Sequence, residues 1–282
     1  MQNPINTDLS GKVAVVTGAG GAICSMLGKS LAAAGAMVAL VDINKEAAEK
    51  CAAQIVKEGG AAKAYAANVL DKQSLAACHA QILQDWGPCD ILINGAGGNN
   101  PRATTDKEYY TAGDIDADTK SFFDLEQSGV EFVFHLNFIG TLLPTQEFAR
   151  DMAERKGGNI INISSMNAFT PLTKIPAYSG AKAAVSNFTQ WLAVHFSQAG
   201  IRVNAIAPGF FSTAQNKNLL WNGDGTPTAR TGKILAATPM GRLGEIEELA
   251  GAVLFLLHEK AASFITGVVI PIDGGFSAYS GV

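Results

Sequence analysis

Tyr178 and Lys182 are the residues of this chain best suited to proton transfer. They lie four positions apart, and on a helix this spacing places both side chains on one face. An ammonium group beside a phenol stabilises the phenolate. Bringing a Tyr pKa from roughly 10 to neutrality requires ~4 kcal/mol, and one cation at ~4 Å supplies about that much at an effective dielectric of ~20. Tyr and Lys also occur at this spacing on solvated helix faces, where they have no catalytic role. The other motifs of the chain therefore determine whether this pair is functional.

A glycine-rich turn follows the first apolar run of the chain. Residues 13–16 are apolar, residues 17–22 read TGAGGA, and apolar residues then recur at helical spacing as far as Leu31. In a doubly wound sheet, the turn after the first strand places a dinucleotide pyrophosphate against free N–H groups of a helix N-terminus. A tight turn without a ligand is the alternative. The residues predicted to contact the phosphates are Gly18, Gly20, Gly21, Ala22 and Ile23.

Asp42 ends the second predicted strand, about twenty residues beyond the glycines, where a carboxylate can accept hydrogen bonds from the ribose hydroxyls of NAD. Ile43 and Asn44 follow it and supply no cation for the 2′-phosphate of NADP. The sequence therefore predicts NAD as the cofactor. A helix N-cap role for Asp42 or Asn44 is the alternative.

The elements that must position these residues alternate along the chain. Apolar runs predict seven strands, at 13–16, 38–41, 62–67, 91–93, 160–163, 202–206 and 267–270. Helical patterns follow the glycine turn and recur at 44–58, 71–86, about 130–155, 178–198 and 245–257. This alternation predicts one α/β domain over residues 1–282, a doubly wound, seven-stranded parallel sheet with helices on both faces. Two insertions interrupt it, at about 99–128 and 209–240, and loops that long are usually functional or disordered.

Composition narrows the range of partners. The net charge of −4 and the pI near 5.6 leave no basic stripe for nucleic acid, so a small molecule is the expected partner. The chain has no run of about 18 apolar residues, and residues 1–6 lack the pattern of a signal peptide, so we expect a cytoplasmic protein without a membrane partner. The four cysteines form no C-x-x-C pair and no cluster with His, which predicts neither a metal site nor disulfides.

From about Leu9 to Phe276, these motifs resemble the short-chain dehydrogenases/reductases. The matching segments are the glycine turn from Thr17, Asn94-Gly95-Ala96-Gly97, Asn137, Ser164-Ser165, Tyr178 with Lys182, Pro208-Gly209 and Asp273-Gly274-Gly275. The resemblance implies that Ser165, thirteen residues before Tyr178, is the catalytic serine, and that the amide of Asn137 holds a water connecting Lys182 to solvent. Besides the turn and Asp42, it implies cofactor contacts from Asn68, Val69, Asn94, Gly95, Ala96, Tyr178, Lys182, Pro208 and Gly209. Ala22 and Cys24 depart from the family pattern where it has glycines, and Asn68 stands where many relatives have Asp.

Four segments resemble the D-mannonate oxidoreductase branch of the family, whose members interconvert D-fructuronate and D-mannonate with NAD(H). They are the acidic insertion between Gly97 and Asn137, Phe122–Leu125 within it, His135–Phe138 and the C-terminal residues 275–282. Such a substrate needs a cation for its carboxylate and polar groups for its hydroxyls. The residues expected to border it are Ser165, Asn167, Tyr178, Arg102, Lys174, Asn216 and Arg230. The resemblance also implies a homo-oligomer, a tetramer or a dimer.

Other functions fit the same core motifs. A 3-oxoacyl reductase or a gluconate-type dehydrogenase would carry the same proton-transfer residues, although the absence of a basic excess argues against an acidic acyl carrier partner. A non-catalytic nucleotide-binding regulator on this fold is a further alternative, since a fold does not prove activity. A regulator would be expected to lack Tyr178, Lys182 or Ser165, and all three are present.

Overall fold

The computed structural model describes residues 6–116, 118–213 and 216–281. The prediction that no signal peptide is present rests largely on residues 1–5, and the resemblance of the C-terminal tail extends to Val282; these residues lie outside the described ranges.

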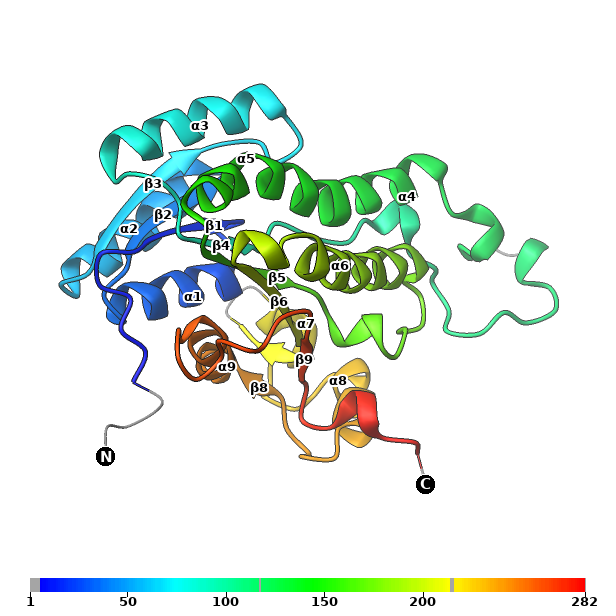
Figure 1. Ribbon diagram of the computed structural model, residues 1–282. Helices are drawn as coiled ribbons and strands as arrows, with labels where there is room; N and C mark the ends of the chain where they lie inside the picture. Colours follow the sequence, from blue (N-terminus) through cyan, green and yellow to red (C-terminus); the bar gives the residue numbers. More distant parts are fainter. Residues whose placement is uncertain (1–5, 117, 214–215, 282) are drawn as a thin grey trace.

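The centre of the molecule is a seven-stranded sheet whose strands are all parallel (Figure 1), which confirms the predicted fold. Its strands are β1 (Val13–Thr17), β2 (Met37–Asp42), β3 (Ala61–Ala66), β4 (Ile91–Asn94), β5 (Gly158–Ile163), β6 (Ile201–Pro208) and β9 (Val269–Ile272). Their order across the sheet is β3-β2-β1-β4-β5-β6-β9. The strands β1 and β4 are buried throughout, as expected for apolar runs covered on both faces.

Helices cover both faces of this sheet. One face packs against α1 (Ala22–Ala33), α2 (Lys45–Lys57) and α9 (Glu248–Leu257), and the other against α3 (Lys72–Asp85), α5 (Gly140–Arg155) and α6 (Pro176–His195). Side chains fix where several helices begin: Asn44 caps α2, Asp71 caps α3, and Pro176 occupies the first position of α6. Among the described residues, no helix is long and apolar enough to cross a bilayer.

The helix predicted at about 130–155 is three consecutive segments. It starts earlier, as α4 (Gln127–Phe134), passes through a π-helical turn at His135–Ile139, and continues as α5. Pro144 lies inside α5, where it cannot donate a backbone hydrogen bond. Single π turns within helices often occur at functional sites, and this one carries Asn137.

The two insertions contain more regular structure than the sequence predicted. Residues 209–240 include β7 (Phe211–Ser212), α7 (Lys217–Leu220) and α8 (Ala229–Ala237), and β7 pairs with β8 (Gly244–Glu245). These elements form because Leu220, Ile234 and Leu243 bury one another in a small separate core. Residues 99–128 contain three 3-10 turns, at Pro101–Ala103, Asp114–Asp116 and Phe122–Asp124, and extend away from the sheet (Figure 1).

Candidate active site

The candidate site lies at the carboxyl ends of β1, β4, β5 and β6, which meet at one edge of the sheet. The ends of β1 and β4 are tied together by Thr17, a fully buried residue. Its hydroxyl oxygen accepts hydrogen bonds from the backbone N–H of Gly95 at 3.1 Å and of Ala96 at 3.4 Å. This contact fixes the glycine turn against the segment that follows β4.

The glycine turn has the geometry that a phosphate site requires. Gly18 has φ of +68°, and a Cβ there would lie 2.8 Å from the Cα of Ala96, so only glycine fits. Gly21 is the N-cap of α1 and offers no side chain to the helix, and the first turn of α1 contains no acidic residue. The first N–H groups of α1 therefore stay available to an anion, whereas in the glycine turn the N–H of Gly20 donates to Asp42 and that of Gly21 to the Gly18 carbonyl.

Cys24, which departs from the family's glycine pattern, is accommodated by another glycine. Its side chain is 3% exposed, and a Cβ built on Gly95 would lie only 2.0 Å from its sulfur. The thiol thus fills the space that a side chain at position 95 would need. Burial raises the Cys24 pKa to about 12, so the thiol stays protonated and unreactive.

Asp42 is held beside the glycine turn. One carboxylate oxygen accepts from the N–H of Gly20 and the other from the N–H of Asn44, both at 2.8 Å. The N-cap role falls to Asn44, whose side chain accepts from the N–H of Ala47 at 3.2 Å. A carboxylate has about four acceptor sites, so Asp42 retains acceptors for ribose hydroxyls. Lys29 and Lys50 line a hollow together with Gly20 and Asn44. The sequence did not predict that these two lysines lie near the glycine turn, because no motif links them to it.

Tyr178, Ser165 and Lys182 come together as predicted, but the pKa of Tyr178 is not the predicted one. The Lys182 nitrogen lies 5.7 Å from the centre of the Tyr178 ring and donates to the Ile163 carbonyl at 2.8 Å. Burial raises the pKa of Tyr178, and a hydrogen bond with the Ser165 side chain opposes this only in part. Burial also lowers the pKa of Lys182 to about 8. The expected depression of the Tyr178 pKa is therefore wrong for this structure, because desolvation outweighs the hydrogen bond with Ser165.

The structure separates the roles of the two adjacent serines. The Ser164 hydroxyl donates to the Lys182 carbonyl at 3.2 Å and lies 2.6 Å from the Ser186 hydroxyl, so it joins β5 to α6. The Ser165 hydroxyl accepts from the N–H of Asn167 at 3.2 Å and faces Tyr178. This placement agrees with the choice of Ser165 for contact with a substrate.

Asn137 is fully buried and fastens the segment after β4 to the π turn. Its amide nitrogen donates to the carbonyls of Gly98 at 2.7 Å and Val133 at 2.8 Å, and its oxygen accepts from the N–H of Gly98 at 3.2 Å. Both amide hydrogens are therefore used, and the predicted water cannot be held through the nitrogen. Only the remaining acceptor site of the oxygen is left for such a water.

The other predicted cofactor residues lie along the same edge. Asn94 is buried, and its side-chain nitrogen donates to Thr145 and Asn162 at 2.9 Å, while its side-chain oxygen has no partner among the described residues. Asn68 is exposed, and its side-chain oxygen accepts from the N–H of Leu70 at 3.0 Å. Val69 is buried, Pro208 ends β6, and a Cβ on Gly209 would lie 2.6 Å from the Cα of Asp273.

The cations expected to bind a substrate carboxylate do not form a cluster. Arg102 is half exposed, donates to Ser128 at 3.3 Å and lies 3.8 Å from Glu126. Arg230 is exposed on the first turn of α8, and Lys174 is exposed with φ of +71°. The side chain of Asn216 bonds within its own turn, to Thr213 and Phe211. Asn167 is buried, and its side-chain oxygen has no hydrogen-bond partner among the described residues.

A contact that the sequence did not reveal joins the two insertions. Lys233, from residues 209–240, lies 2.7 Å from Glu108, from residues 99–128. The hydrogen bond from Lys233 lowers the pKa of Glu108, and the charge of Lys174 adds to this effect. Two cations from different segments therefore stabilise the charged form of one carboxylate, Lys233 by direct contact and Lys174 by its charge alone. A separation of 125 residues explains why no sequence pattern predicted it.

Among the described residues, no group of three or more His, Cys, Asp or Glu side chains is arranged to hold a metal ion. The four cysteines are all buried and free.

Comparison with known proteins gives the context for this geometry. A family model described as short chain dehydrogenase matches residues 12–222. An uncharacterized oxidoreductase of Haemophilus influenzae is 61% identical over 98% of this chain and 97% of its own length, and an uncharacterized oxidoreductase UxuB of Bacillus subtilis is 48% identical over 99% of both chains. A crystal structure from Haemophilus influenzae, with the provisional name D-mannonate oxidoreductase and with bound NAD, has a TM-score of 0.94 at 61% identity, covering 99% of both chains.

Proposed function

The chain belongs to the short-chain dehydrogenase family and is an oxidoreductase of that family, and from this premise we propose that it interconverts a sugar-acid alcohol and its ketone, D-mannonate and D-fructuronate. The observation that carries the proposal is the pairing of Ser165 with Tyr178 beside buried Lys182, at the strand ends next to the glycine turn. The sequence identity of 61% to a protein with the provisional name D-mannonate oxidoreductase supports this substrate.

In the proposed reaction, the residues of the chain position the substrate and move one proton. NADH supplies the hydride to the carbonyl carbon, and Tyr178 donates its proton to the carbonyl oxygen as the alcohol forms. A neutral phenol is the required donor, and the raised pKa of Tyr178 keeps it protonated at neutral pH. Ser165 would hydrogen-bond the same oxygen. Lys182, fixed by the Ile163 carbonyl, would direct its remaining N–H groups to the nicotinamide ribose.

NAD is the cofactor that the residues favour. The uncapped first turn of α1 would bind the pyrophosphate, and Asp42 would accept from the adenosine ribose hydroxyls. A carboxylate at this position repels a 2′-phosphate, which disfavours NADP. The related structure with bound NAD supports the same cofactor.

The two insertions would close over the substrate and hold its carboxylate. Both leave the carboxyl ends of strands, and the Glu108–Lys233 contact joins them. Glu108 bonds to Lys233, and the charge of Lys174 also lowers the pKa of Glu108, so a carboxylate at this position is stabilised by cations from two segments. We infer that a substrate carboxylate takes the place of Glu108 on one of these lysines. Arg102 and Arg230 remain candidates from the sequence.

Alanine and methionine variants test this assignment of the carboxylate. Lys174→Met or Lys233→Met should lower kcat/KM for D-fructuronate about ten- to hundredfold, because a hydrogen bond to a charged group is worth about 1.5–3 kcal/mol. The loss should be much smaller with an uncharged keto-sugar. Lys120→Met is the control, since Lys120 lies on the insertion that carries Glu108 and donates to the Pro101 carbonyl at 3.3 Å. If neither lysine variant nor Arg102→Ala or Arg230→Ala shows the selective loss, the carboxylate is bound elsewhere.

The function itself is tested by a substrate panel. D-Fructuronate, 5-keto-D-gluconate and a 3-oxoacyl thioester would be assayed with NADH and with NADPH, and we expect the highest kcat/KM for D-fructuronate with NADH. Tyr178→Phe should abolish most turnover and retain NADH affinity. A kcat above about a tenth of wild type, a loss below ~1.4 kcal/mol, would exclude an essential proton-transfer role for Tyr178. A preference for 5-keto-D-gluconate would favour the gluconate-type alternative, which a 34% identical gluconate 5-dehydrogenase of Gluconobacter oxydans also supports.

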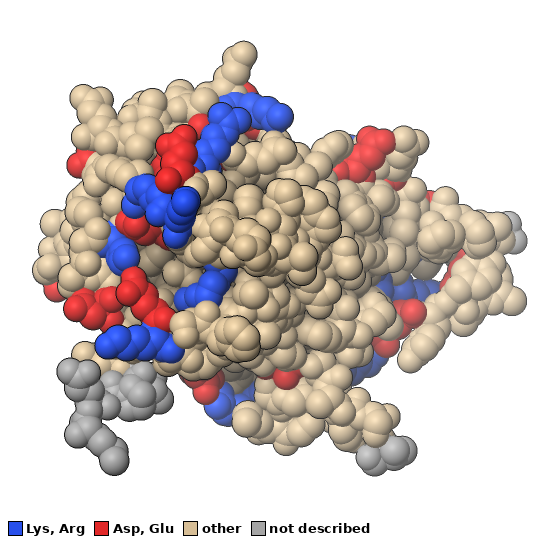
Figure 2. Space-filling model, in the orientation of Figure 1, with Lys and Arg blue, Asp and Glu red and all other residues tan. Residues whose placement is uncertain are grey.

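We also propose that the chain forms a homo-oligomer through the outer face of α6. Figure 2 shows a broad area without charged side chains at the centre of this view of the molecule, over the position of α6 in Figure 1. Trp191 and Val194 are 55% and 78% exposed on α6. A second copy can cover this face without opposing like charges. Light scattering should detect a dimer or tetramer that Trp191→Glu dissociates, and a monomeric wild type would refute the proposal.

A further inference from the structure

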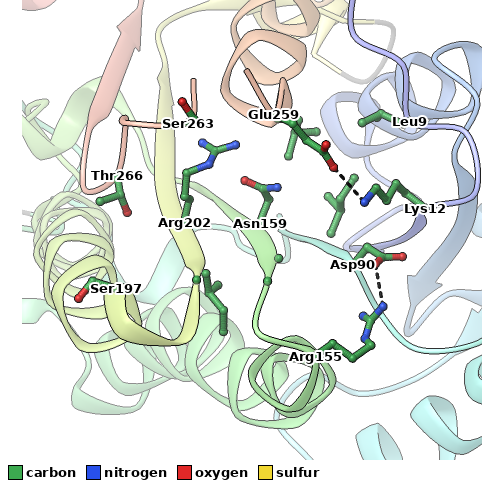
Figure 3. Close-up of a pocket in the computed structure, with 16 residues that line it drawn as sticks. Leu9, Lys12, Asp90, Arg155, Asn159, Ser197, Arg202, Glu259, Ser263 and Thr266 are labelled. Atoms are coloured by element: carbon green, nitrogen blue, oxygen red, sulfur yellow. Dashed lines mark hydrogen bonds and ion pairs between the residues drawn. The ribbon is translucent and has the colours of Figure 1, made fainter. Parts of the chain in front are cut away.

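A cavity of about 580 Å³ opens at the amino ends of the central strands (Figure 3). Its lining comes from the first residues of β4, β5 and β6 and from the helix ends and loops that precede β1, β5, β6 and β9. All these strands are parallel, so their amino ends lie at the opposite edge of the sheet from Ser165 and Lys182. The cavity is therefore separate from the candidate active site and has no role in the proposed reaction.

The charges around this cavity favour an anion. Its lining contains three cations and two carboxylates, although the whole chain has a formal net charge of −4. Lys12 is paired with Glu259 at 3.0 Å, and Arg155 with Asp90 at 2.8 Å (Figure 3). Arg202 has no ion-pair partner within the described ranges, although the charge of the Glu259 carboxylate in the same lining raises its pKa in part against burial.

Two polar atoms in the lining lack hydrogen-bond partners among the described residues: Nη2 of Arg202 and the side-chain oxygen of Asn159. Arg202 uses its other terminal nitrogen, which donates to the Ile265 carbonyl at 3.2 Å. Asn159 and Arg202 are register partners on β5 and β6, and their side chains lie next to each other in Figure 3. Leaving a buried donor or acceptor unpaired costs about 1–3 kcal/mol, so a ligand that pairs both is favoured.

We propose that this cavity binds a small hydroxy carboxylate, with its carboxylate on Arg202 and a hydroxyl group on Asn159. A guanidinium binds a carboxylate through two parallel hydrogen bonds, and a hydroxyl can donate to the orphan amide oxygen. Arg202 and Asn159 are each only partly buried, so their side chains can turn toward a ligand. The volume is ample for a six-carbon acid, and Ser263 and Thr266 add hydroxyl groups to the lining.

Calorimetric titration of the full chain saturated with NADH tests the proposal. Sodium D-gluconate is the probe, since it carries both groups, and acetate and D-glucitol each carry one of them. We expect gluconate to bind at least about tenfold more tightly than either, because each lost pairing leaves a buried group unsatisfied.

Variants then locate the bound gluconate, which could also enter the active site. Arg202→Gln should weaken gluconate binding about ten- to hundredfold and leave NADH binding unchanged. Lys57→Gln is the control with the same change of charge, since Lys57 is exposed in the last turn of α2. This variant should bind gluconate like the wild type. Ser263→Glu, at an exposed position of the lining, should repel the anion and cause a similar loss without altering the contacts of Arg202.

Three results would overturn the proposal. Gluconate binding that is unchanged in both Arg202→Gln and Ser263→Glu would place the acid elsewhere. Binding of D-glucitol as tight as that of gluconate would make the ligand a neutral polyol. The absence of any binding heat in the wild type at millimolar gluconate would mean that the cavity holds only water. If Arg202→Gln does not fold, the Ser263→Glu titration alone decides between these results.

Discussion

Gly95 and Cys24 should be coupled in stability, because the two residues share one space. In Gly95→Ala, the new Cβ would lie 2.0 Å from the Cys24 sulfur and 3.0 Å from the Thr17 carbonyl oxygen. Carbon atoms in van der Waals contact are roughly 3.5–4.0 Å apart. The packed sulfur would have to move by more than an ångström, and overpacking of a buried site costs about 1–3 kcal/mol. We expect the upper end of this range, since the other neighbour is backbone.

A variant that carries both Gly95→Ala and Cys24→Ala tests whether the two residues compete for the same space. Cys24→Ala alone should cost about 1 kcal/mol, because it removes one buried group the size of a methylene. Combined with Gly95→Ala, it removes the clashing atom, so the double variant should be at least ~2 kcal/mol more stable than the sum of the single changes predicts. Gly98→Ala is the control, since a Cβ there would meet its nearest neighbour, in Leu136, at 3.6 Å. Urea unfolding of the four variants measures the coupling, and additivity within about 0.5 kcal/mol would refute it.

Two further predictions concern the cofactor and pH. Asp42→Ala should narrow the ratio of kcat/KM between NADH and NADPH, and a wild type that prefers NADPH would contradict the role of Asp42. NADH affinity, measured by fluorescence titration between pH 7 and 9.5, should be constant below about 8 and fall above it. The reason is that the Lys182 pKa of about 8 lets the buried ammonium lose its proton there, and NADH must then bind with uptake of a proton. Lys182→Met should bind NADH weakly with no such pH dependence, whereas an identical pH profile in this variant would assign the effect to another group.

The sequence was sufficient for the sheet because each strand contains a short, mostly apolar run that alternates with a helical pattern. Each of the seven predicted strands is present, and no boundary differs by more than two residues, the largest difference, which is found at β5, β6 and β9. Local pattern failed where long-range contacts decide the structure. The short elements of residues 209–240 form because a few apolar side chains bury one another, and the Glu108–Lys233 contact joins segments far apart in sequence. Neither this small core nor the Glu108–Lys233 contact produces a repeating pattern of apolar and polar residues in the sequence.

The site was predictable in its residues but not in its electrostatics. Spacing alone places Tyr178 and Lys182 on one helix face, and the structure confirms that geometry. Their protonation depends on depth of burial, which spacing does not report.

Burial disfavours the charged form of each group, so it raises the pKa of Tyr178 and lowers that of Lys182. The pKa of Lys182 therefore falls below that of Tyr178, and at neutral pH Tyr178 is a neutral phenol while Lys182 remains mostly an ammonium. This state suits donation of a proton to a developing alkoxide, which is the reductive direction. Oxidation needs the phenolate and so becomes faster as pH rises. The protonation state of the pair at neutral pH thus follows from its desolvation, and the glycine turn and Asp42 could not have indicated it.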